Sequence, residues 1–425
     1  MKKGRQRFVI GAVIAVMFSF SSCYTATKVS NQNIVDSYKN DFHTLHPEFK
    51  LLHVNDSVSQ LYFKINESEL LFERKSLADS FSANVKIFCR VTLNYESPLV
   101  MDSNTVVLNI QSSTSNKKEF AVGTINLKLN RGGKYVISIS TSDLVGKRND
   151  LTYLEANKTD YLGEQNFLVR DIANGHILFN RWFDTTAQVA IQCFHPINKL
   201  FVKFYRNNFP IAAPPFSADE YESPRLKSDT AYYIQQHNGI FQVTLKGRGL
   251  YHFMADSNDL EGLTLFRFDE SYPEVTQAYQ MVAPLRYISS NDEFEKLVGS
   301  KNPKQDVDNF WLTTSSGNQE KARELIRGYY GRIQDANRYF TSYQEGWKTD
   351  RGMIYLVYGA PSSIYRTSSG ETWTYGEEKN YMSLTFYFLK LENPFSNNDY
   401  ALQRQATYRN LWYNAVDLWR EGRVY

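Results

Sequence analysis

The stretch EGWKTDRGMIYLVYGAP, residues 345–361, places three glycines and a proline around a tryptophan and an apolar run. It combines a Gly-Trp pair, a Thr-Asp-Arg-Gly turn and an apolar run that stops at Gly359 and Pro361. The run at residues 353–358 predicts a β-strand, because it is short, rich in Ile, Tyr and Val, and bounded by turn residues. Two interpretations follow: the stretch holds the packing of a domain together, or it is part of an active site.

The structural interpretation gives each residue a role. Trp347 is large enough to fill the junction between a long helix and a sheet, with its indole N–H bonded to a carbonyl. In the predicted turn, Asp350 accepts backbone N–H bonds and Gly352 permits a positive φ. Arg351 then pairs with Asp350 or Glu345. This interpretation is the one that the residue types favour.

The enzymatic interpretation needs a constellation of catalytic groups. Asp350 and Glu371 are predicted at adjacent strand ends, where two carboxylates could act in acid–base catalysis. The sequence contains no G-x-S-x-G elbow, no P-loop and no H-E-x-x-H motif, and its seven histidines are scattered. We therefore expect no catalytic residue, no metal site and no cofactor. A hydrolase that uses Asp350 or Glu371 is the alternative.

Residues 268–425 predict a compact α+β domain around this stretch. Ser290 and Glu293 form a capping box that opens one short helix, and a second ends near Thr314. Asn318 caps a long helix with apolar residues at i, i+3, i+4 and i+7. A short antiparallel sheet follows, with strands expected at residues 353–358, 371–375 and about 382–392. A helix over about residues 401–425 closes the chain.

The order of these features resembles a known family. Gly346, Trp347, Thr349 and Asp350 match the motif that names the GWxTD domain of exported proteins of Gram-negative bacteria. The segments RGMIYLVYGAP, ETWTYG and YYGRIQDANRYF look like the rest of its signature, over about residues 270–420. The resemblance implies an exported, often lipid-anchored protein and assigns no catalytic residue. The motif and structural residues are Gly346, Trp347, Thr349, Asp350, Arg351, Gly352, Gly359, Pro361, Glu371, Trp373 and Tyr375.

The N-terminus predicts export and lipidation. Four basic residues precede an apolar run from Phe8 to Phe20, which is too short to span a bilayer, so residues 1–22 are predicted to be a signal peptide. The small residues before Cys23 resemble a lipoprotein cleavage site, so we expect acylation of Cys23. Residues 23–45 are polar and predict a tether. The first acidic residue after Cys23 is Asp36, which favours an outer-membrane protein that faces the periplasm.

Two β-rich regions are predicted between the tether and the α+β domain. Residues 46–160 and 161–267 consist of short alternating strands separated by turn residues, which indicates two Ig-like sandwiches or one sandwich with a long insertion. Cys89 and Cys193 lie in apolar strands, where two separate buried thiols are favoured over a disulfide. The fold class is thus all-β sandwiches followed by an α+β domain.

Composition limits the possible partners. Without residues 1–22, the 48 Lys and Arg fall to 44, against 45 Asp and Glu. The net charge is then close to zero, so the chain has no overall positive charge that would attract nucleic acid. Aromatic residues make up 15% of the chain, which favours broad contact surfaces. In the last helix, Leu411, Ala415 and Leu418 are predicted to face the core. We expect a non-enzymatic scaffold of an envelope assembly, held on the membrane by a lipid anchor and bound to an envelope protein.

Overall fold

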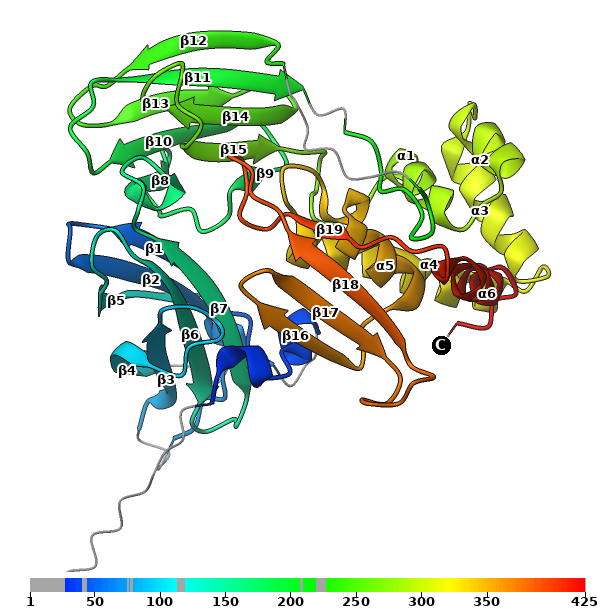
Figure 1. Ribbon diagram of the computed structural model, residues 1–425, viewed down its shortest axis with the longest axis horizontal. Helices are drawn as coiled ribbons and strands as arrows, with labels where there is room; N and C mark the ends of the chain where they lie inside the picture. The colour runs from blue at the N-terminus through cyan, green and yellow to red at the C-terminus, as the bar shows by residue number, and fades with distance from the viewer. Residues whose placement is uncertain are drawn as a thin grey trace, which may run out of the picture.

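A computed structural model describes residues 27–39, 44–74, 76, 79–112, 119–206, 209–218 and 227–424 of the chain. The predicted signal peptide and Cys23 lie outside these residues. Figure 1 shows two β-rich parts, one above the other, beside a part that contains the helices and a further sheet. None of the helices in the described part of the chain is both long and apolar enough to cross a membrane.

The first β-rich part consists of two antiparallel sheets around one core. One sheet has the order β1-β2-β5 and the other β4-β3-β6-β7. The strands are β1 Glu48–His53, β2 Val58–Asn66, β3 Phe81–Thr92, β4 Val100–Ser112, β5 Phe120–Lys128, β6 Lys134–Asp143 and β7 Asn149–Asn157. Every second residue of β2 is buried, because alternate side chains of a strand point to opposite faces of its sheet.

The second β-rich part also consists of two sheets, with the orders β13-β10-β8 and β12-β11-β14-β15-β9. The strands are β8 Phe167–Asp171, β9 Trp182–Phe183, β10 Ala187–Cys193, β11 Lys199–Arg206, β12 Thr230–Gln235, β13 Phe241–Leu245, β14 Gly249–Met254 and β15 Leu263–Arg267. Its core is separate from that of the first part. Cys89 is buried in the first core, Cys193 lies on β10, and both are free thiols.

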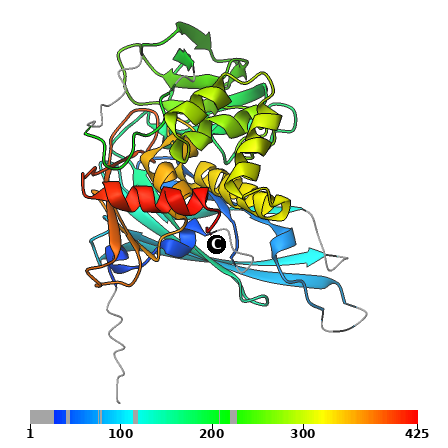
Figure 2. The ribbon, with the colours of Figure 1, turned by 90° about the vertical axis from the view of Figure 1, so that its right-hand side faces the viewer.

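Helices and a four-stranded sheet follow, so the predicted order of β-rich parts before an α+β domain is confirmed. The helices that follow β15 begin with α1 Ala278–Val282, η5 Ala283–Tyr287, α2 Asn291–Val298, α3 Pro303–Thr314 and α4 Gln319–Phe340. The predicted capping box of Ser290 and Glu293 is present, and the Asn318 side chain caps α4. In Figure 2 the yellow helices and the red α6 lie together on the side that faces the viewer.

The sheet differs from the prediction at both ends. Its order is β16-β17-β18-β19, with β16 Ser363–Thr367, β17 Gly370–Tyr375, β18 Leu384–Lys390 and β19 Tyr400–Leu402. The predicted strand at residues 353–358 is wrong, because these residues belong to α5, Asp350–Tyr358. The last helix, α6 Tyr408–Arg420, begins later than predicted, because β19 takes up its expected first residues.

Residues 27–39, within the segment expected to be a tether, contribute instead to the C-terminal core. They form two short 3-10 helices, η1 Val29–Asn31 and η2 Val35–Tyr38. Val29, Ile34, Val35 and Tyr38 are buried in the same core as α4, α5 and β17. The backbone N–H of Ile34 donates to the carbonyl of Ile364 in β16, 2.9 Å away. Figure 1 shows these blue turns beside β16.

Candidate functional site

The motif residues lie at the start of α5, where a tight turn meets the long helix α4. Gly346–Lys348 form a 3-10 turn, η6, and Thr349 caps α5. The Thr349 hydroxyl accepts a hydrogen bond from the N–H of Gly352 at 3.0 Å and donates one to the carbonyl of Gly346 at 2.8 Å. The predicted turn over Thr349, Asp350 and Gly352 is therefore the first turn of a capped helix.

Two glycines of the motif allow backbones to approach closely. A Cβ added to Gly346 would lie 1.9 Å from the carbonyl oxygen of Ala336 in α4. A Cβ added to Gly352 would lie 1.9 Å from the carbonyl oxygen of Gly346. Gly352 has no positive φ, so close packing, and not the predicted backbone angle, requires a glycine there. Gly359, which ends α5, does have a positive φ, of 80°.

Trp347 is buried, with 8% of its surface exposed. Its backbone N–H donates to the side-chain oxygen of Asn337 in α4 at 3.2 Å, and its carbonyl accepts from the Tyr287 hydroxyl at 3.3 Å. Its ring meets that of Tyr287 edge to face, with centroids 6.3 Å apart. These contacts join η6 to α4 and η5, whereas the sequence predicts a junction between the long helix and the sheet.

Asp350 joins α5 to the end of the sheet and to a Pro-rich segment. Its carboxylate accepts from the backbone N–H of Leu402 at 2.7 Å and binds the Arg404 guanidinium with both oxygens, at 3.1 and 2.5 Å. Arg404 also donates to the carbonyl of Ala213 at 3.2 Å. Burial raises the pKa of Asp350, and Arg404 lowers it in part. The predicted local bonds of Asp350 within a turn are thus replaced by contacts with residues more than 50 positions away.

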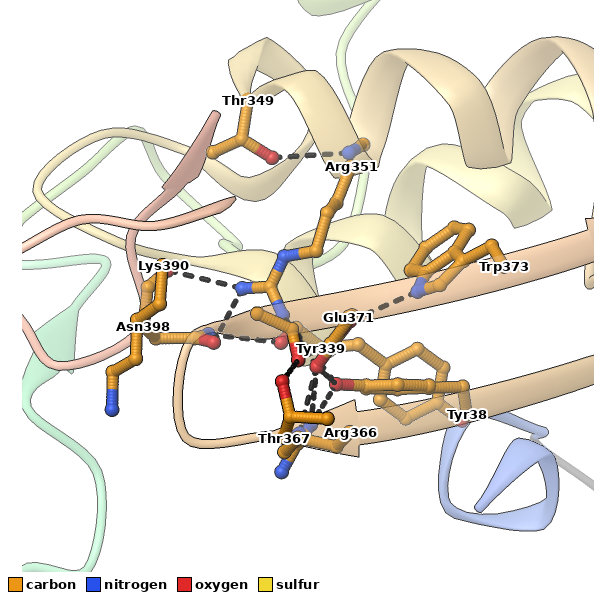
Figure 3. A network of polar contacts seen from close by, with 12 residues as sticks. Tyr38, Tyr339, Thr349, Arg351, Arg366, Thr367, Glu371, Trp373, Lys390 and Asn398 are labelled. Carbon is orange, nitrogen blue, oxygen red and sulfur yellow. Dashed lines mark hydrogen bonds and ion pairs between the residues drawn. The ribbon is translucent and has the colours of Figure 1, made fainter. Parts of the chain in front are cut away.

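Arg351 is almost completely buried, at 1% exposure, and it pairs with Glu371, not with Asp350 or Glu345 as predicted. Its guanidinium lies 3.3 Å from a Glu371 oxygen and 3.9 Å from the centre of the Tyr400 ring. It also donates to the carbonyl of Asn398 at 3.0 Å. Figure 3 shows the Arg351 guanidinium between α5 and the strands of the sheet.

Glu371 is the acceptor at the centre of this network. Its Oε1 accepts from the Arg366 guanidinium at 2.8 Å and from the Tyr38 hydroxyl at 2.9 Å, and its Oε2 accepts from the Trp373 indole N–H at 2.9 Å. Burial would raise the pKa of Glu371, but Arg366 and Arg351 outweigh that effect and hold it at about 2. The group is therefore a carboxylate at neutral pH, surrounded by donors.

The remaining predicted site residues support the same packing. Trp373 is fully buried, and its ring lies 5.4 Å from that of Phe340 in α4. The Tyr375 hydroxyl donates to the carbonyl of Gly359 at 2.8 Å, which ties the end of α5 to β17. Pro361 is buried at the start of the connection to β16. The structure therefore brings Arg351, Glu371 and Trp373 together, and it places Asp350 in a separate ion pair.

Two contributors were missed from the sequence. Tyr38 lies in a segment expected to be a tether, and Arg366 lies in a turn between the predicted strands. No pattern in the sequence around Tyr38 or Arg366 marks either residue as part of a site. Among the residues that the structure describes, no three His, Cys, Asp or Glu side chains come together in a way that could hold a metal ion.

The comparison with known families decides the classification. The family model of the GWxTD domain matches residues 249–421. Residues 249–421 form a GWxTD domain. The match to the GWxTD domain begins at β14, within the second β-rich part, and so earlier than the boundary expected at residue 268. No curated protein matches the chain.

Proposed function

We propose that this protein is a lipid-anchored scaffold of an envelope assembly, attached to the outer membrane through an acylated Cys23 and facing the periplasm. In this proposal the β-rich parts act as spacers and the GWxTD domain engages a protein partner. The proposal extends the GWxTD match, which by itself assigns no activity.

One observation carries the scaffold role: the carboxylates of Glu371 and Asp350 are both buried and bound by donors from within the protein. Glu371 is 3% exposed and accepts hydrogen bonds from four side chains, and Asp350 is 7% exposed and bound to Arg404. A general acid or base needs a pKa near the working pH and access to its substrate. A buried carboxylate with a pKa of about 2 has neither property, so the arrangement favours a structural role over the hydrolase alternative.

The last helix provides a surface for a partner. Leu411 and Leu418, which the sequence predicts to face the core, are 44% and 43% exposed, because α6 is rotated so that Trp412, Ala415 and Trp419 face inward. Leu411 and Leu418 are seven positions apart, so they lie on the same side of the helix. Exposed apolar residues on one helix side are a common mode of protein recognition.

Site-specific photo-cross-linking in cells tests the proposal. A photoreactive amino acid is placed at Leu418, and in a matched strain at Lys86, which is exposed on β3 of the first sheet pair. The proposal expects a discrete adduct with an envelope protein from position 418, which is lost when Cys23→Ser removes the acylation site. Adducts of equal yield from both positions, or adducts that do not depend on Cys23, would contradict it.

A further inference from the structure

A cavity of about 370 Å³ lies where the two β-rich parts meet the GWxTD domain. The first part contributes residues of β1, among them Lys50, and the second contributes Arg181 and Trp182. The GWxTD domain contributes Arg366, Asn398 and Tyr400, so the cavity borders the network around Glu371. Its volume falls in the range of small-molecule sites, which is roughly 300–1,000 Å³.

Lys50 is the unusual residue of this cavity. Lys50 is only 8% exposed. Within the described ranges, its ammonium forms no hydrogen bond or ion pair with another residue. Burial lowers the pKa of Lys50, and Glu164 raises it in part. A buried ammonium without a partner is costly, so such groups are nearly always paired or hydrogen-bonded.

The other cations around the cavity have carboxylate partners. Arg181 pairs with Glu164 at 2.7 Å, and Arg366 pairs with Glu371 at 2.7 Å. Arg338 pairs with Asp335 at 3.2 Å and also with Glu274. The cavity therefore has one lysine whose charge is unmatched by the described chain.

Aromatic rings form much of the remaining wall. Phe49, Phe179, Trp182, Phe266 and Tyr400 line the cavity. Polar and charged side chains make up most of the rest of the wall. In a site that binds a small organic molecule, rings bury the body of the ligand and polar groups fix its orientation.

From this combination we infer that the cavity binds a small organic anion, with its apolar or aromatic body against these rings and its anionic group on the Lys50 ammonium. The inference goes beyond the scaffold role and does not depend on it. A ligand at this position contacts all three parts of the chain, so its binding stabilises their arrangement by mass action.

A pair of fluorescent probes that differ in one anionic group tests the inference. 8-Anilinonaphthalene-1-sulfonate carries a sulfonate on an aromatic body, and N-phenyl-1-naphthylamine is the same body without it. Affinities of both probes are measured by fluorescence titration of the full-length chain and of its Lys50→Met variant. We expect Lys50→Met to weaken the sulfonate probe by about tenfold or more, as for loss of a buried ion pair. Binding of the neutral probe should stay unchanged.

Lys86→Met is the matched control, because Lys86 is exposed on β3 and does not line the cavity. It should leave both affinities unchanged. Thermal unfolding of Lys50→Met checks that the variant is folded, and its midpoint should not fall, since the substitution removes an unpaired buried charge. The inference is overturned if the wild-type chain binds neither probe, or if Lys50→Met weakens both probes equally or neither.

Discussion

The hydroxyl of Tyr38 donates a 2.9 Å hydrogen bond to the carboxylate of Glu371, 333 positions further along the chain. This bond joins the N-terminal segment to the central acceptor of the GWxTD domain. The Tyr38 ring also packs against Phe340, with centroids 5.2 Å apart. The segment that contains Tyr38 and the GWxTD domain thus share one core.

Tyr38→Phe removes this donor and keeps the ring. We expect the free energy of unfolding to fall by about 1.5–3 kcal/mol, the usual range for a hydrogen bond to a charged group. Urea unfolding followed by tryptophan fluorescence measures the change. Tyr365→Phe is the matched control, because Tyr365 donates to Glu378 at 2.8 Å on the exposed surface, where water replaces the lost bond. Equal effects in the two variants would contradict a central role for Tyr38.

Glu371→Gln keeps the shape of the side chain but leaves Arg351 and Arg366 buried without their counter-charge. Breaking a buried ion pair in this way costs about 3–5 kcal/mol. The same urea experiment should show this loss, while Glu378→Gln, at the exposed surface, should change little. A loss below that of Tyr38→Phe would show that Glu371 does not hold the network together.

The pH dependence of stability should also identify Glu371. Its pKa of about 2 in the folded chain lies below the ordinary value of 4.5, so between these pH values the unfolded chain binds more protons. Stability is therefore complete above about pH 4.5 and falls as the pH drops toward about 2. Glu371→Gln should flatten this part of the curve. Parallel curves for the wild type and the variant would exclude Glu371 as the source.

The glycines of the motif give a prediction about packing. Gly346→Ala places a methyl group against the carbonyl of Ala336, so η6 and α4 must separate, and we expect a loss of about 1–3 kcal/mol. Gly331→Ala, within α4, is the control, because nothing lies within 4 Å of the added Cβ. It should stabilise the protein by up to about 1 kcal/mol through helix propensity. Thermal unfolding of the two variants should move in opposite directions.

Trp347→Ala should destabilise the GWxTD domain by about 3–5 kcal/mol, as truncation of a buried Trp does. Trp347 lies against Tyr287, so the effect should appear as a lower unfolding midpoint of the full-length chain. Tyr381→Ala, at a residue that is 95% exposed, is the control and should unfold as the wild type does. An unchanged midpoint for Trp347→Ala would show that this residue contributes little to packing.

The sequence predicted the capped helices and the sandwich-like sheets well, because amphipathic periods and capping boxes are local signals. The strand expected at residues 353–358 failed for a physical reason. Residues 350–357 are all buried, so α5 has no polar side and no helical period. Thr349 as a cap, Asp350 in the first turn and Gly359 at the end were the available helix signals.

The candidate site was predicted only in part. Arg351, Glu371 and Trp373 were singled out, but their partners were not, since contacts such as that between Tyr38 and Glu371 join distant parts of the chain. The polar composition of residues 23–45 hid four buried apolar residues among hydrophilic neighbours. The cavity around Lys50 depends on three separate parts of the chain and has no sequence signature.

On the proposed Cys23 anchor, the burial of Val29 in the C-terminal core would limit how far the protein body can move from the membrane. Only four residues lie between Cys23 and Lys28, the residue before η1, so five Cα-to-Cα steps join them. A chain extends by at most about 3.6 Å per residue, so the linker from Cys23 to Lys28 is at most about 18 Å long. The GWxTD domain would then stand next to the lipid headgroups, and its partners would meet it at the bilayer surface.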